Sequence, residues 1–146
     1  MYHIRHNITT FEIILGILGA FGMMAMMLSP VLGKFMMGIA LSLLFVLYLL
    51  FVMAPRDPDI DSRFQLVLNR INFMTSSIAS VILFIMLIFL PGNFALALSA
   101  LGLSIICMTL NASHRYLYCI CDEDYFHQQL RLLVMAILVV VVMASG

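Results

Sequence analysis

The side chains best suited to chemistry lie in the last third of the chain, where two histidines and two cysteines fall within fourteen residues: His114, Cys119, Cys121 and His127. Nitrogen and sulfur donors of this kind bind zinc or copper. The spacing H-x4-C-x-C-x5-H lacks the two-residue gap that separates paired cysteines in ordinary zinc sites. We therefore predict no metal and keep these four residues as an alternative ligand set; the simpler interpretation is a segment at a membrane surface with reduced thiols.

Motifs for catalysis are absent from the sequence. It contains no G-x-S-x-G, no H-E-x-x-H, no phosphate loop and no dinucleotide fingerprint. The thirteen methionines point in several directions around their expected helices, which is typical of gap-filling at helix contacts rather than of metal ligation. We expect a protein that is not an enzyme and that has no cofactor.

Transport chemistry normally needs an ionisable group at membrane depth. Glu12 and Lys34 are expected at helix ends, where both side chains would reach the membrane surface. A single chain would then offer no proton relay and no charged substrate site. Several hydroxyls could line a pore made of several copies, although hydrogen bonds between helices are their commoner use: Ser76, Ser77, Ser80, Ser99, Ser104 and Thr109.

The composition indicates a membrane protein. A length of 146 residues predicts one domain over residues 1–146. The chain is 64% hydrophobic and 10% charged, whereas soluble domains have about 25% charged residues. The lipid bilayer is thus the expected environment, and the zero net charge argues against nucleic acid as a partner. Glu12 interrupts the entry to the first apolar segment and no small-x-small cleavage site follows, so we expect that segment to be retained rather than removed as a signal peptide.

Apolar segments and breakers predict five membrane-spanning helices. The first begins near a capping box, Thr9 with Glu12, and ends at Ser29 before a proline. A link of residues 30–34 leads to the second helix at 35–54. A second capping box, Ser62 with Gln65, precedes the third, whose apolar part is 73–90. The fourth and fifth are expected at 94–111 and 122–144.

The fifth span is the least determined element. Its charge-free part, residues 132–144, has thirteen residues, fewer than the seventeen or so that a spanning helix usually needs. The fold prediction is therefore an all-α, polytopic helical membrane protein with five transmembrane helices. The alternative is four spans and a C-terminal helix that lies at the membrane surface.

The basic residues predict the orientation. With the N-terminus in the cytoplasm, only Lys34 lies outside, and the arginines fall on the inner side: Arg5, Arg56, Arg63, Arg70, Arg115 and Arg131. The compact chain with short loops favours a bacterial inner membrane.

Small residues spaced along the apolar segments predict where helices pack closely. The set comprises Gly16, Gly19, Ala20, Gly38, Ser42, Ser76, Ser80, Ala100 and Ser104. The fourth helix is especially rich in such residues, and we expect it at the centre of the bundle.

The polar intervals 55–72 and 113–131 form the expected docking surface on the inner side, with mixed charges: Arg56, Asp57, Asp59, Asp61, Arg63 and Arg70. The function predicted is that of a non-enzymatic membrane subunit that assembles with itself or with a membrane partner through its small-residue faces. The alternatives are an oligomeric pore or membrane-perturbing effector, and a membrane metal or redox protein that uses the Cys/His cluster.

Overall fold

The described part of the chain is helical throughout. The computed structural model describes residues 7–53, 63–89, 94–117 and 123–145, which form five α-helices: α2 (Ile8–Leu28), α3 (Pro30–Met53), α4 (Arg63–Ile88), α5 (Phe94–Leu117) and α6 (Glu123–Ser145). The all-α prediction is confirmed.

Three of these helices are long and apolar enough to cross a membrane. They are Ile8–Leu28, Pro30–Met53 and Leu66–Ile88, that is, α2, α3 and most of α4. The apolar parts of α5 and α6 are shorter, Leu98–His114 and Gln129–Ala144. Length and composition therefore indicate a membrane protein.

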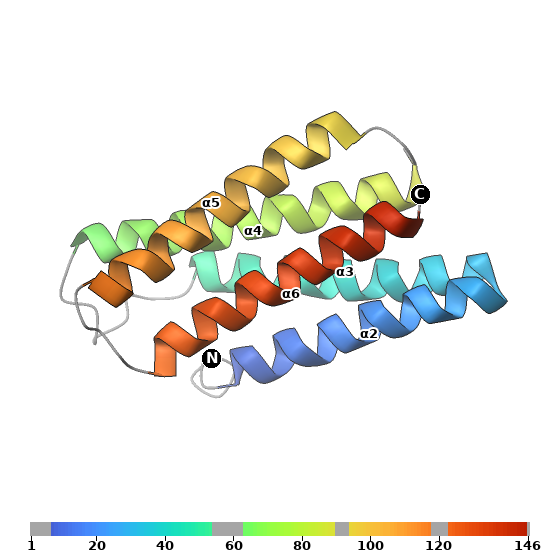
Figure 1. The fold of residues 1–146 in the computed structure, drawn as a ribbon, viewed down its shortest axis with the longest axis horizontal. Coiled ribbons are helices and arrows are strands. Elements are labelled where there is room, and N and C mark those ends of the chain that lie inside the picture. Colours follow the sequence, from blue (N-terminus) through green and yellow to red (C-terminus); the bar gives the residue numbers. More distant parts are fainter. Residues whose placement is uncertain (1–6, 54–62, 90–93, 118–122, 146) are drawn as a thin grey trace.

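The helices are arranged as an antiparallel series that closes on itself (Figure 1). Along the series, α2 packs on α3, α3 on α4, and α4 on α5. The last helix, α6, returns to pack between α2 and α5 and also touches α4. Among the described helices, α5 contacts only α4 and α6, so it lies at the edge and the prediction that it forms the centre is wrong.

The turn between α2 and α3 is a single residue, Ser29. Its N–H donates to the Ala25 carbonyl at 2.8 Å, and its own carbonyl accepts from Gly33 at 3.0 Å. Pro30 is the first residue of α3, where its missing N–H costs nothing because that donor would have no intrahelical partner. The predicted link over residues 30–34 is therefore wrong, and Lys34 lies within α3.

The predicted capping box at the start of α2 does not form. The helix begins at Ile8, after Asn7, and no side chain caps it. Thr9 and Glu12 both lie inside the helix, and the Glu12 side chain points into the bundle instead of back to the helix end. The second box depends on Ser62, which lies outside the described residues. At the other end of the chain, α5 continues to Leu117, beyond its predicted end at 111.

The backbones of α2 and α3 touch where two glycines face each other. A Cβ atom on Gly33 would lie 2.5 Å from the Met26 nitrogen and 2.6 Å from the Gly22 oxygen. A Cβ on Gly22 would lie 3.0 Å from the Met37 nitrogen. No side chain fits at either position, so these glycines set how closely the first two helices approach.

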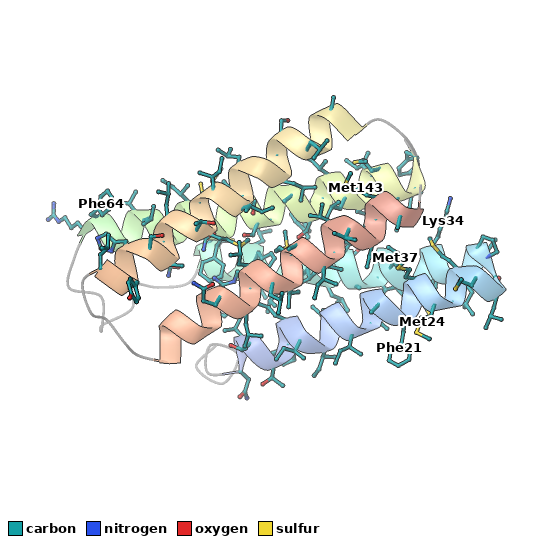
Figure 2. The ribbon with its side chains drawn as sticks, in the orientation of Figure 1. Phe21, Met24, Lys34, Met37, Phe64 and Met143 are labelled. Atoms are coloured by element: carbon teal, nitrogen blue, oxygen red, sulfur yellow. The ribbon has the colours of Figure 1, made fainter. Side chains whose placement is uncertain are left out.

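Apolar side chains cover both the inside and the outside of the bundle (Figure 2). Met37 is buried, whereas Phe21 and Met24 point outward and are 58% and 65% exposed. Lipid tails are as apolar as a protein core, so an outward apolar surface suits a bilayer.

The glycine contact predicts a stability difference. Gly33→Ala should lower the free energy of unfolding by about 1–3 kcal/mol, because the added methyl group forces two backbones apart. Gly102→Ala is the matched control, since an added Cβ there meets no atom within 4 Å. The control should be neutral or should stabilise α5 by up to about 1 kcal/mol. Thermal unfolding in mild detergent measures both; equal melting temperatures would contradict the prediction.

Candidate functional site

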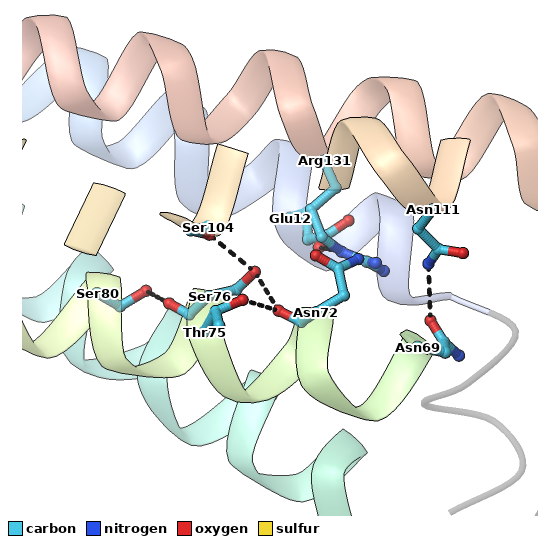
Figure 3. A network of polar contacts seen from close by, with 9 residues as sticks. All are labelled: Glu12, Asn69, Asn72, Thr75, Ser76, Ser80, Ser104, Asn111 and Arg131. Atoms are coloured by element: carbon cyan, nitrogen blue, oxygen red, sulfur yellow. Dashed lines mark hydrogen bonds and ion pairs between the residues drawn. The ribbon is translucent and has the colours of Figure 1, made fainter. Parts of the chain in front are cut away.

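The most unusual feature of the bundle is a buried ion pair between its first and last helices. The Arg131 Nε donates to the Glu12 Oε1 at 2.6 Å (Figure 3). Glu12 has no exposed surface and Arg131 is 2% exposed. The two residues are 119 positions apart in the sequence. This Glu12–Arg131 pair joins α2 to α6.

Two aromatic rings from the intervening helices lie beside the guanidinium. The Arg131 Cζ lies 4.2 Å from the ring centre of Phe73 on α4 and 5.9 Å from that of Tyr48 on α3. Phe73 is itself stacked on Phe51, with ring centres 5.1 Å apart. A desolvated cation over an aromatic face gains about 2 kcal/mol. We call Glu12, Tyr48 and Phe73 together the arginine site.

The arginine site leaves polar atoms that hydrogen bonds to the described residues do not satisfy. These are the second carboxylate oxygen of Glu12 and the Tyr48 hydroxyl, both buried. The Tyr48 hydroxyl nevertheless interacts electrostatically with both Glu12 and Arg131. The two charges of the ion pair and the Tyr48 hydroxyl are therefore buried together inside an apolar bundle.

Small residues on α2 place α6 in the register that the ion pair needs. A Cβ on Gly16 would lie 3.3 Å from Val134 Cγ1, and one on Gly19 would lie 2.8 Å from Leu138 Cδ2. Glu12, Gly16 and Gly19 lie on one face of α2, and their partners on α6 follow in the same order. The two helices therefore run parallel, with two α6 side chains seated over glycines (Figure 1).

The remaining predicted packing residues are distributed over several surfaces. Gly38 faces Phe84 of α4, whose Cε2 would lie 3.4 Å from an added Cβ. Ala20 and Ser42 are exposed, and the Ser42 hydroxyl donates to the Gly38 carbonyl at 2.8 Å. Ala100 is half-buried on α5.

A second polar layer lies between α4 and α5, beside the ion pair (Figure 3). The Ser76 hydroxyl donates to the Asn72 carbonyl at 2.8 Å, and the Ser80 hydroxyl donates to the Ser76 carbonyl at 2.9 Å. Ser76 and Ser104 hydroxyls meet across the two helices at 3.4 Å. About two turns from that contact, near the start of α4 and the end of α5, Asn111 Nδ2 donates to Asn69 Oδ1 at 3.4 Å.

The hydroxyls predicted as pore-lining candidates do not gather on one surface. Ser76, Ser77, Ser80 and Ser104 are buried, whereas Ser99 and Thr109 are exposed. The Thr109 hydroxyl donates to the Ile105 carbonyl of its own helix at 2.8 Å. Hydrogen bonds within and between helices account for the buried part of this set.

The predicted metal and docking residues lie mostly outside the described residues. Cys119, Cys121, Arg56, Asp57, Asp59 and Asp61 all fall there, as does the side chain of His127. His114 is half-buried, and its ring centre lies 5.5 Å from that of Phe64. Within the described ranges, no three His, Cys, Asp or Glu residues cluster as a metal site would need. Arg63 and Arg70 are exposed on α4.

The expectation for Glu12 was wrong. It placed Glu12 at a helix end from which the side chain would reach the membrane surface. The structure instead turns the carboxylate inward onto Arg131. The one feature of the sequence that could have indicated the pair is that two opposite charges stand next to the first and last apolar segments. Nothing near Glu12 in the sequence indicates that its partner is Arg131.

Neither a protein-family model, nor a curated protein, nor a solved structure matches this chain. Its function therefore has to be inferred from its own residues.

The ion pair predicts strong coupling between two distant positions. Glu12→Leu or Arg131→Leu alone should lower the free energy of unfolding by about 3–5 kcal/mol, because each leaves a buried charge uncompensated. The double variant should lose less than either single variant, since no charge then remains buried. Unfolding in mixed micelles with increasing dodecyl sulfate measures this cycle. Arg70→Leu removes an exposed arginine and should change stability by no more than about 0.5 kcal/mol. Additive effects at positions 12 and 131 would contradict the coupling.

Proposed function

We propose that this chain is a non-enzymatic integral membrane subunit that works by assembly, through an outward face of α5. We define this face by Ser99, Gly102, Ile106 and Thr109 and call it the outer stripe of α5. The proposal includes five membrane spans, a cytoplasmic N-terminus and a place in a bacterial inner membrane. The observation that carries it is the open space beside Gly102.

The small residues of α2 and α3 support this choice of face because they are already used within the chain. Gly16 and Gly19 receive side chains of α6, and Gly38 faces α4. Gly22 and Gly33 hold α2 against α3. A partner helix cannot use positions that the chain itself fills.

The outer stripe of α5, unlike the glycines of α2 and α3, is not covered at Gly102 by another of the described helices. Its members follow one another at intervals of three and four residues, so they share one face of the helix. Ser99, Ile106 and Thr109 are exposed, and a Cβ added to Gly102 would meet no atom within 4 Å. In a membrane, a glycine between small hydroxyl residues lets a second helix approach closely. A second copy of the chain or a partner helix would fit there.

The orientation is supported by the distribution of basic residues along the bundle. Arg63 and Arg70 belong to the end of the bundle at which α2 begins, and Lys34 lies towards the opposite end (Figure 2). Cytoplasmic ends of membrane helices carry an excess of basic residues. The end with Arg63 and Arg70 would then face the cytoplasm.

No catalytic step belongs to this proposal. Glu12 and Arg131 are paired with each other, and the Arg131 guanidinium lies over the Phe73 ring. The serines near them donate to backbone carbonyls. The polar interior would then serve to hold the helices in place while the outer surface makes the contacts.

The assembly proposal is tested by placing a large side chain on the outer stripe. Gly102→Leu should shift the protein in mild detergent from an oligomer, or from a complex with a second protein, to a monomer, because the side chain blocks close approach. Ala20→Leu is the matched control: it enlarges a small, exposed residue on α2 and should leave the mass unchanged. Light scattering with chromatography measures the mass, and thermal unfolding verifies that both variants fold.

Two results would refute the proposal. One is a parent protein that is monomeric and has no co-purifying protein. The other is an assembly that Gly102→Leu leaves intact.

A further inference from the structure

We propose that α6 is a conditional membrane span, which crosses the bilayer because Glu12 on α2 neutralises Arg131. This inference rests on the five-span topology proposed above. It assigns Glu12 a role beyond packing: the carboxylate determines on which side of the membrane the C-terminal end of the chain lies.

The length of α6 makes Arg131 part of any span. Residues 132–144 carry no charge, but at helical rise they cover only about 20 Å. The apolar core of a bilayer is about 30 Å thick. For the C-terminal end of α6 to reach the far side, Arg131 must enter the membrane region. An arginine there is costly unless a partner neutralises it.

The rest of the bundle offers a site made for that arginine. Glu12, Tyr48 and Phe73 come from α2, α3 and α4, respectively. These are the same three helices that are long and apolar enough to span a membrane without help. They supply a carboxylate at 2.6 Å from Arg131 and an aromatic ring centre at 4.2 Å. The three helices that can span the membrane by themselves thus form the arginine site, and α6 needs that site in order to span.

The apolar contacts of α6 fix the same position along α2. With Arg131 on Glu12, Val134 lies over Gly16 and Leu138 over Gly19. A shift of α6 by a few residues would lose the ion pair and would also move both side chains off their glycines. The inserted position is therefore defined at three successive points.

Loss of the Glu12 charge should favour a placement of α6 along the membrane surface over a placement across the bilayer. Without the carboxylate, the guanidinium loses the anion that lies 2.6 Å from its Nε. A helix with an unneutralised arginine and a short apolar stretch is better accommodated along the membrane surface, with the charge in water. The C-terminal end of α6 would then remain on the inner side.

The experiment measures which side of the membrane Met143 occupies in the full-length chain. Cys107, Cys119 and Cys121 are first replaced by serine, and Met143→Cys provides a single thiol at an exposed position near the end of α6. A membrane-impermeant maleimide is applied to intact cells and to inverted membrane vesicles. The ratio of outer to inner labelling reports the fraction of chains in which α6 spans.

The parent should be labelled from the outside. Glu12→Leu should lower the labelling ratio by roughly tenfold or more, because an unpaired charge in the membrane shifts such an equilibrium by at least that factor. Glu12→Leu combined with Arg131→Leu should restore outer labelling, since no charge then opposes insertion. Phe11→Leu, which changes an exposed residue next to Glu12 without altering any charge, should leave the ratio unchanged.

The outcomes separate this inference from the proposed function. Inner labelling of the parent would overturn the five-span topology together with the conditional span. Outer labelling of both the parent and Glu12→Leu would overturn the conditional span and leave five spans standing. A double variant that stays on the inner side would also overturn it, because the defect would then not depend on charge.

Discussion

Placing a carboxylate and a guanidinium among apolar helices is unfavourable by several kcal/mol for each ion, and the cost is tolerable only if the two meet. The Glu12–Arg131 pair is the constraint to which the rest of this bundle conforms. The pair requires α6 to pack beside α2 and parallel to it, although three helices, α3 to α5, separate the two in the sequence. The glycines on α2 and the rings of Tyr48 and Phe73 are arranged around that requirement.

The two ends of the bundle consequently differ in character. Near the end at which α2 begins are the ion pair, the Asn69–Asn111 contact and the tilted ring contact of Phe64 with His114. At the other end, α2 and α3 meet through glycines and a one-residue turn. At one end, polar side-chain contacts therefore specify which helices are neighbours. At the other end, close backbone approach at the glycines and the short turn specify it.

Local features were predictable from the sequence, and tertiary partners were not. Long apolar runs between breakers are a local property, which explains why the all-helical fold and three long apolar helices could be predicted. Pro30 was misread because proline both ends helices and suits their first position. The spacing of Thr9 and Glu12 does match a capping box, but a carboxylate takes the stronger partner, and Arg131 lies 119 residues away.

Because 119 residues separate Glu12 from Arg131, the two residues are also synthesised at different times. Ribosomes add about 5–20 residues per second, so Arg131 is added to the chain roughly ten seconds after Glu12. During that interval the partner that Glu12 has in the folded bundle does not yet exist. A chain cut short before α6 never acquires that partner. The contact between α2 and α6 is thus the last of the bundle's ion pairs and hydrogen bonds named above to become available during synthesis.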